Sequence, residues 1–281
     1  MSALPPLPEF ERPPVVELVL DIQFQPIAGL DVPRLGLLWQ QFRAGFPKVE
    51  QQLPASPLIE RFGSVATDEV EVLIEPFAAP PLPRLWFLGS DGSELIQVQN
   101  NRFIHNWRKL RPDDSYPRYE KVRGRFREEL RQFEAFLASE QLGLAVPDLC
   151  EITYYNHVRA GSGWEHHGEL HEVLRVWKPD FGEDFLANRE LEGSSVSFQF
   201  LMRDDEGRPF GRWRVSVQPG FDRKRDVPIF VITNTARGRP LGDGLDGALS
   251  FLDVGHEWTV RGFAAVTTEA QHRWWGRTNG G

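Results

Sequence analysis

The sequence predicts an α+β protein in which antiparallel strands form one curved or paired sheet, with two long helices packed on it. Three observations support this fold class. Several short stretches alternate apolar and polar residues, as strands with one buried face do. Residues 117–142 instead carry a continuous apolar stripe at helical spacing. Strands are grouped ahead of a long helix, which favours an antiparallel sheet over alternating βαβ units.

The same order of strands and helices occurs twice along the chain, so we expect two similar halves within one compact unit. Each half would run strand, short helix, several antiparallel strands and long helix. The halves would span residues 15–145 and 146–276. An extended, proline-rich lead-in over residues 1–14 would precede them, and a flexible tail over residues 277–281 would follow.

The first half contains several strands and a short helix ahead of its long helix. Apolar residues alternate along residues 15–24 and again along 68–75, which predicts two strands. Between them, the apolar spacing over residues 33–46 predicts a helix that Pro47 ends. Residues 84–107 predict further strands, separated by turns near residues 90–93 and 100–101.

The long helix over residues 117–142 is the strongest local prediction. Asp114 or Ser115 can cap it, Pro117 suits its first turn, and Gly143 suits its end. Its apolar stripe consists of Tyr119, Val122, Phe126, Leu130, Phe133 and Leu137.

The second half repeats the pattern and ends in two helices. Residues 168–177 can form a short helix or a strand, and residues 246–265 predict a long helix capped by Asp246. Thr268 and Gln271 have capping-box spacing, which predicts a last short helix. The strands are predicted at residues 150–158, 194–202, 211–219 and 228–235.

Composition excludes several functional classes. The chain has 281 residues, with 32 basic and 40 acidic side chains giving a net charge of −8. This balance argues against a protein that coats nucleic acid. No apolar run is long enough to span a bilayer, and no leader sequence is recognisable. Cys150 is the only cysteine, so no intramolecular disulfide can form, and we expect a cytoplasmic protein.

Two stretches nevertheless carry excess positive charge. Residues 102–131 have a balance of +5, from ten basic and five acidic side chains, and residues 203–239 have +4, from nine and five. Aromatic residues interleave with both stretches, a composition typical of surfaces that bind phosphates or single strands. Ordinary solvated helix charges explain the pattern equally well. Weak binding of nucleic acid or a phosphate ligand is therefore an alternative function.

A histidine-rich stretch over residues 164–172 is a candidate metal site. His167 and His171 are four residues apart and would share one face of a helix, with Glu165 or Glu172 as a further ligand. The order His-x-Glu-x-His differs from that of zinc proteases, and a solvated polar loop is the simpler interpretation. The Gly-x-Gly-x-x-Gly match at residues 242–247 contains two aspartates that would repel a pyrophosphate. We therefore expect no bound cofactor or metal.

Asp253 and His256 lie three residues apart on the predicted terminal helix. A carboxylate at this spacing can orient an imidazole, so the pair is a candidate general base. No nucleophile motif accompanies it, which favours a structural hydrogen bond. A His- or metal-dependent hydrolase that uses this pair or residues 165–171 remains the enzymatic alternative.

The first strand has a polar face that could bind a ligand or partner. Glu17, Asp21 and Gln23 project opposite the apolar side chains of the strand. If both long helices cover one side of the sheet, the other side is polar and open. A small ligand or a protein partner would bind there, although an antiparallel sheet can also simply expose such a face to water.

Four ordered motifs give the chain a family resemblance: PPVVELVLDIQF, QVQNNRFIHNW, EITYYNHV and LDVGHEWTVRGFAAVTTEAQHRWWG. From Pro13 to Gly276 it resembles a sporadically distributed family of uncharacterised bacterial proteins. The resemblance brings no established activity. The patchy occurrence of the family implies a mobile accessory gene, linked to defence or toxin systems. Our leading functional hypothesis is a non-enzymatic binding or accessory protein of such a system. The positions that match the family motifs are Glu17, Asn106, Trp107, Asn156, Asp253, His256, His272 and Trp275.

Overall fold

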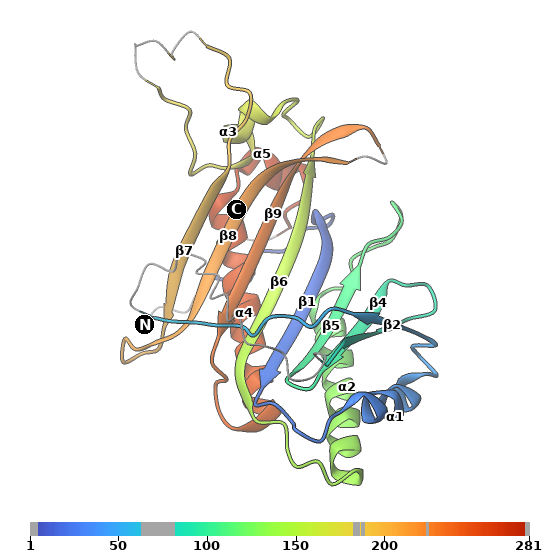
Figure 1. Ribbon diagram of the computed structural model, residues 1–281. Helices are drawn as coiled ribbons and strands as arrows, with labels where there is room; N and C mark the ends of the chain where they lie inside the picture. The colour runs from blue at the N-terminus through green and yellow to red at the C-terminus, as the bar shows by residue number, and fades with distance from the viewer. Residues whose placement is uncertain (1–4, 63–81, 182–185, 187–188, 223–224, 279–281) are drawn as a thin grey trace.

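The computed structural model describes residues 5–62, 82–181, 186, 189–222 and 225–278 (Figure 1). They form one nine-stranded antiparallel sheet with the strand order β2-β3-β4-β5-β1-β6-β9-β8-β7. The expected α+β class with an antiparallel sheet is confirmed, and the strand predicted at 68–75 lies outside the described residues. The strands are β1 (Val15–Phe24), β2 (Lys48–Gln52), β3 (Arg84–Leu88), β4 (Glu94–Gln99), β5 (Arg102–Arg108), β6 (Pro147–Arg159), β7 (Val196–Arg203), β8 (Pro209–Asp222) and β9 (Val227–Gly238).

The centre of the sheet is the pair β1 and β6. Leu20 lies opposite Ile152 of β6 on one side and opposite His105 of β5 on the other. The alternating apolar residues of β1 are fully buried beneath the helices. The strand boundaries match the period-two pattern of the sequence because one face of β1 contributes to the core.

The helices within the described residues are α1 (Val32–Phe42), α2 (Tyr119–Ser139), α3 (Leu170–Val173), α4 (Gly244–Val266) and α5 (Glu269–Trp274), with a 3-10 turn at His167–Glu169. In Figure 1, α4 lies behind the sheet, where it contacts β6, β8 and β9, while α2 contacts β5. A Cβ atom at Gly262 would lie 2.3 Å from the ring of Trp213, so glycine permits the close approach of α4 to the sheet. No helix in these ranges combines the length and apolar character needed to cross a membrane.

Several predicted boundaries were wrong. The long helix begins at Tyr119, after Arg118, and has no side-chain cap. Asp114 instead accepts hydrogen bonds from the backbone N–H groups of Leu110 and Arg111, and so stabilises a turn before the helix. The N-cap of α4 is Asp243, with Asp246 inside the first turn. The edge strand β2 was missed because its residues, KVEQQ, show little apolar alternation.

The cap of α5 was predicted correctly. The Thr268 side chain accepts a hydrogen bond from the backbone N–H of Gln271.

Two extended segments cover opposite faces of the sheet. Residues 53–62, here called the crossing segment, run across the strands on the viewer's side in Figure 1. The backbone of Ser56 and Leu58 accepts hydrogen bonds from Arg102 of β5 and Gln23 of β1. Farther along, the Glu60 side chain binds Arg212 and Arg214 of β8.

On the helix side, residues 5–14 form what we call the N-terminal strap. The backbone N–H groups of Glu11 and Arg12 donate to the carbonyls of Gly276 and Trp275, each at 2.9 Å. The ring of Phe10 is buried against Phe263 and Trp275. The strap holds the first described residues against the last, because the N–H of Thr278 also donates to the carbonyl of Glu9.

Candidate functional site

The polar face of β1 is largely engaged within the protein. Asp21 is 3% exposed and forms a bidentate ion pair with Arg102, at 3.1 and 2.5 Å. Burial raises the pKa of Asp21 to about 6, although the arginine opposes this shift. Glu17 accepts a hydrogen bond from Asn106 at 2.6 Å, and burial raises its pKa as well. The open polar face expected from the sequence is therefore crossed by residues 53–62 and tied by internal pairs.

The histidine-rich stretch does not gather its candidate ligands. His167 directs Nε2 at the carbonyl oxygens of Gly220 and Ile229, each at 3.0 Å. His171 instead lies near Glu172, and the N–H of Glu165 donates to Glu169. The described residues contain no group of three or more His, Cys, Asp or Glu side chains that could hold a metal ion.

Four residues from the family motifs pack in the interior. Trp107 packs on Tyr116 with ring centroids 5.4 Å apart, and Trp275 stacks on Phe263. His272 is 1% exposed, and its two ring nitrogens contact Thr267 and Arg277. Asn106, as described above, joins β5 to Glu17 of β1. These positions stabilise the sheet and the C-terminal segment.

Asp253 and His256 have different partners. The Asp253 carboxylate accepts hydrogen bonds from Tyr119 at 2.7 Å and from Arg123 at 2.9 and 3.1 Å. His256 directs Nδ1 at the hydroxyl of Tyr154, at 2.8 Å. The hydrogen bond expected between Asp253 and His256 is absent from the described residues, so the candidate general-base pair does not form.

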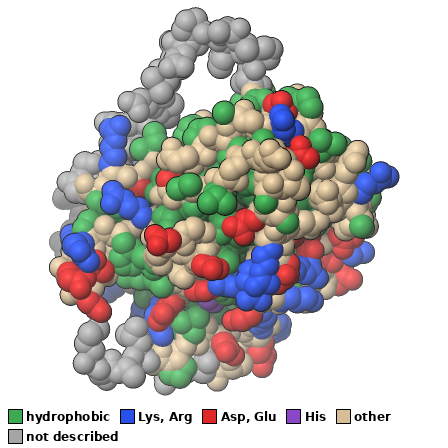
Figure 2. Space-filling view, turned by 90° about the horizontal axis from the view of Figure 1, so that it is seen from below, with side chains coloured by type: hydrophobic (Ala, Val, Ile, Leu, Met, Phe, Trp, Pro, Cys, Tyr) green, Lys and Arg blue, Asp and Glu red, His purple; other side chains and the backbone are tan. Residues whose placement is uncertain are grey.

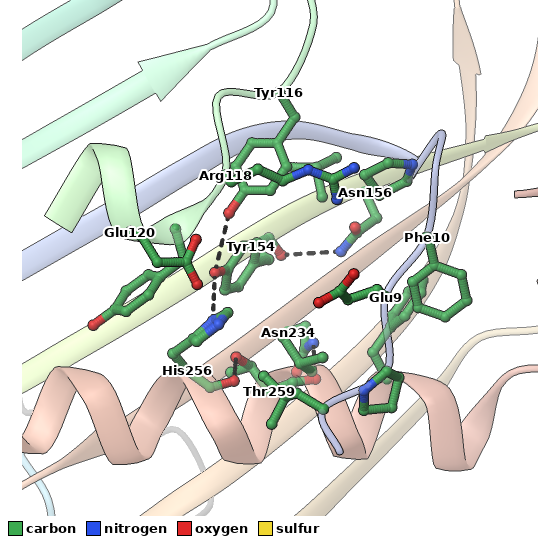
Figure 3. A pocket seen from close by; sticks show the side chains of 17 residues that line it. Glu9, Phe10, Tyr116, Arg118, Glu120, Tyr154, Asn156, Asn234, His256 and Thr259 are labelled. Carbon is green, nitrogen blue, oxygen red and sulfur yellow. Dashed lines mark hydrogen bonds between the residues drawn. The ribbon is translucent and has the colours of Figure 1, made fainter. Parts of the chain in front are cut away.

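His256 and Asn156 line a cavity of about 400 Å³ on the helix side of the sheet. The cavity is enclosed by the N-terminal strap, the start of α2, α4, and strands β6 and β9 (Figure 3). We call it the strap cavity. Its lining includes Phe10, Tyr116, Arg118, Tyr119, Tyr154, Asn156, Asn234, His256, Thr259, Val260 and Phe263, together with the carboxylate-bearing Glu9 and Glu120.

A chain of side-chain hydrogen bonds crosses the strap cavity. The hydroxyls of Tyr116 and Tyr154 lie 3.3 Å apart, and Tyr154 continues the chain to His256 (Figure 3). The ring of Tyr119 stacks on the imidazole, with centroids 3.9 Å apart and planes at 10°. Burial lowers the pKa of His256 to about 4, so the ring is neutral near pH 7. Burial also raises the pKa values of Tyr116 and Tyr154, which keeps both hydroxyls protonated.

Two polar atoms in this wall lack partners among the described residues. Asn156 is 3% exposed, and its Nδ2 donates to the carbonyl oxygens of Tyr154 and Ile232, which leaves Oδ1 free. His256 uses Nδ1 in the chain and keeps Nε2 free. Both residues line the cavity, so water or a bound molecule can satisfy these two atoms.

Arg118 shapes the mouth of the strap cavity through an unusual backbone conformation. Its φ of 72° and ψ of 154° lie in a region that is nearly restricted to glycine. The residue ends the loop that carries Tyr116 and begins the helix that carries Tyr119. Strained backbone of this kind often occurs at binding sites, where the surrounding fold holds it in place.

Tyrosine content was the sequence signal that could have located the cavity. The chain has four tyrosines, and three of them, Tyr116, Tyr119 and Tyr154, line the cavity. Their separation in the sequence conceals this grouping, which depends on α2 and β6 meeting in space.

The two basic stretches are partly neutralised. Arg102, Arg212 and Arg237 each bind a carboxylate on the sheet, and on the face shown in Figure 2 basic side chains stand beside acidic ones. Trp213, one of the interleaved aromatic residues, is buried and stacks on Phe200. These contacts lower the positive charge available to nucleic acid.

Comparison with known proteins adds no identity: no family model matches the chain, and no curated protein does.

Proposed function

We propose that this protein binds a small organic ligand in the strap cavity without transforming it. The observation that carries the proposal is the combination of a partly open pocket of about 400 Å³ with two unpartnered polar atoms in its wall. Ligand sites are commonly apolar or aromatic concavities with a few fixed polar groups. The family resemblance supports a role as an accessory protein of a mobile bacterial system.

The wall favours a ligand with an apolar or aromatic body and a hydrogen-bonding edge. Tyr119 and Phe263 offer aromatic ring surface, and Val260 offers aliphatic surface. Asn156 Oδ1 accepts from an N–H or O–H donor, while the neutral imidazole of His256 either donates or accepts through Nε2. The ligand would thus bind by shape and by two directed hydrogen bonds.

Binding without chemistry is supported by the side chains available. The described residues that line the cavity include neither serine nor cysteine. The Thr259 hydroxyl donates to the carbonyl of His256, and the Asp253 carboxylate is bound to Tyr119 and Arg123. A hydrolase would need an activated nucleophile or water next to a base.

The sheet order also supports the proposal that two similar halves build the cavity. β1 lies beside β5, the last strand of the first half, and β6 lies beside β9, the last strand of the second. In this arrangement each half ends in a long helix on the same face. The cavity then forms where α2, α4 and the central strands meet.

The test is a ligand screen with a variant whose cavity is filled. A fragment library is screened by saturation-transfer NMR against wild type, Val260→Trp and Ala265→Trp. Val260 lines the cavity, whereas Ala265 is exposed on the same helix. We expect fragments that bind wild type and Ala265→Trp but not Val260→Trp. His256→Phe should keep the ring stacking and weaken the same fragments about tenfold, since one hydrogen bond to a neutral group contributes about 0.5–1.5 kcal/mol.

Two results would contradict the proposal. One is a library with no binder of the wild type. The other is a set of binders that bind Val260→Trp as tightly as wild type, because their site would then lie elsewhere.

A further inference from the structure

A second cavity, of about 640 Å³, adjoins the strap cavity. It lies at the end of β5 and β6, beside α5, and shares Pro13, Val15, Tyr116 and Arg118 with the first cavity. Four basic residues that are distant in the sequence line it: Arg12, Lys109, Arg118 and Arg159. Tertiary structure therefore brings positive charge to one open pocket.

Two of these cations have partners within the protein. Arg159 forms an ion pair with Asp222 at 3.3 Å, and Arg12 donates to the carbonyl of Trp274 at 3.2 Å. The Lys109 ammonium and the Arg118 guanidinium have no side-chain or backbone partner among the described residues. Arg118 is exposed and Lys109 is half-buried, so both cations are accessible to a ligand.

The acidic residues of the second cavity offset this charge only in part. Glu11, Asp113 and Asp114 also line it. Asp114 accepts hydrogen bonds from two backbone N–H groups and from Arg111, so its charge is largely satisfied locally. Glu11 and Asp113 remain as the carboxylates that an anionic ligand would meet.

Lys109 lies in an unfavourable environment in the absence of an anion. It is half-buried, and burial together with Arg159 and Arg225 lowers its pKa, although Asp113 and Asp114 oppose this shift. An anion placed against the ammonium would relieve the repulsion between these like charges.

Aromatic side chains adjoin the two unpartnered cations. Trp274 is 56% exposed and lines the cavity, together with Trp275 and Tyr116. Large exposed rings beside cations suit a ligand with a planar organic group next to its charge.

We propose that the second cavity binds an organic phosphate monoester, with its phosphate oxygens on Lys109 and Arg118 and its organic group against Trp274. A monoester carries a charge of about −1.5 to −2 near pH 7, which matches two uncompensated cations. Arginine binds phosphate through a planar fork, and lysine binds it as a point charge. The site shares Arg118 with the adjoining strap cavity, whereas Lys109 and Trp274 line the second cavity and not the strap cavity.

Isothermal titration calorimetry with phenyl phosphate as the probe tests the proposal. Wild type should bind it, and Lys109→Met should weaken binding about tenfold or more, since hydrogen bonds to charged groups contribute about 1.5–3 kcal/mol. The matched control is Lys48→Met, which makes the same change at an exposed lysine of the edge strand β2, outside the cavity lining. The control should change the affinity less than about threefold, because exposed charges are screened by salt.

Arg118→Gly separates loss of the site from loss of the fold. Glycine adopts the backbone conformation of Arg118 without strain, so this variant should raise Tm while weakening phenyl phosphate about tenfold. Val260→Trp should leave phenyl phosphate binding unchanged, which distinguishes this proposal from that for the strap cavity.

Three results would overturn the proposal. The first is no binding of phenyl phosphate to wild type at millimolar concentration. The second is an Arg118→Gly or Lys109→Met variant that binds as tightly as wild type. The third is benzoate, a monoanion of similar shape, binding as tightly as phenyl phosphate.

Discussion

On the face of the sheet crossed by residues 53–62, the carboxylates of Asp21, Glu60 and Glu151 each bind at least one arginine. On the opposite face, beneath the N-terminal strap, His256 and Asn156 each keep a polar atom without a protein partner among the described residues. Both regions are formed where an extended segment covers the sheet. The fold itself satisfies the carboxylates of the first region, whereas these two atoms of the second region line a cavity.

This difference separates polar groups that hold the fold from those available to a ligand. A buried charge without a partner is costly, so paired charges such as Glu60 and its arginines fix the crossing segment in place. A polar atom that faces a cavity can be satisfied by solvent or by a bound molecule. The paired carboxylates therefore indicate a structural role for the crossing segment, and the unpartnered atoms support the binding that we propose for the strap cavity.

The largest expected effect is loss of the buried charge in the crossing segment. The Glu60 side chain is fully buried between Arg212 and Arg214. Glu60→Gln leaves two guanidinium groups without their carboxylate and should lower the free energy of unfolding by about 3–5 kcal/mol, measured by urea denaturation. Glu206→Gln, in an exposed pair with Arg208, should change it by less than about 0.5 kcal/mol. A loss at Glu60 as small as at Glu206 would break the comparison.

An intermediate effect is expected from the pH dependence of His256. Its pKa is about 4 in the folded protein and about 6.5 in the unfolded chain, so only the unfolded chain binds this proton between these values. Above pH 6.5 the ring is neutral in both states, so its titration costs no stability. As pH falls from 6.5 towards 4, the unfolded chain takes up the proton first and the free energy of unfolding decreases. Wild type should therefore lose about 2–3 kcal/mol more stability than His256→Phe over this interval, by urea denaturation at several pH values.

The difference in stability between wild type and His256→Phe removes the contribution of the other histidines, because these titrate in both. Parallel stability profiles for wild type and His256→Phe would show that the ring of His256 is as accessible to protons in the fold as in water.

The smallest change in the free energy of unfolding is expected for Asp253→Asn. Asp253 lies near the strap cavity, so this variant tests whether its partners have a structural role there. Its side chain is 47% exposed, so Asp253→Asn should cost no more than about 1 kcal/mol despite its bonds to Tyr119 and Arg123. Asp253 and His256 do not bind each other but share Tyr119, so the double variant Asp253→Asn with His256→Phe should show a coupling energy of about 0.5–1 kcal/mol. A coupling energy above about 1 kcal/mol in urea denaturation would restore the pair as a functional unit.

Much of the secondary structure could be predicted because it depends on local patterns. The alternation of β1, the apolar stripe of α2 and the Thr268 cap of α5 are confirmed. Errors arose where a boundary depends on non-local packing. α2 begins at Tyr119, with Arg118 at the N-cap position in place of Asp114 or Ser115.

The candidate sites could be predicted only in part. His256 and Asn156 were named from the sequence, but the partner proposed for His256 was Asp253 rather than Tyr154. The polar face of β1 was expected to be open, and residues 53–62 cross it. Neither outcome has a local signal, since these contacts join residues that are 35 to 102 positions apart.

The sequence by itself determined which residues form the main strands and helices, because burial of one face imposes the same period whatever lies against that face. Only the tertiary structure decided which residues meet. Strand order places β6 beside β1 and so brings Tyr154 to Tyr116, and the same order brings Lys109, Arg118 and Arg159 to one cavity. Periodicity specifies the side of an element that faces the core, but the partner across the core depends on long-range pairing of the whole sheet.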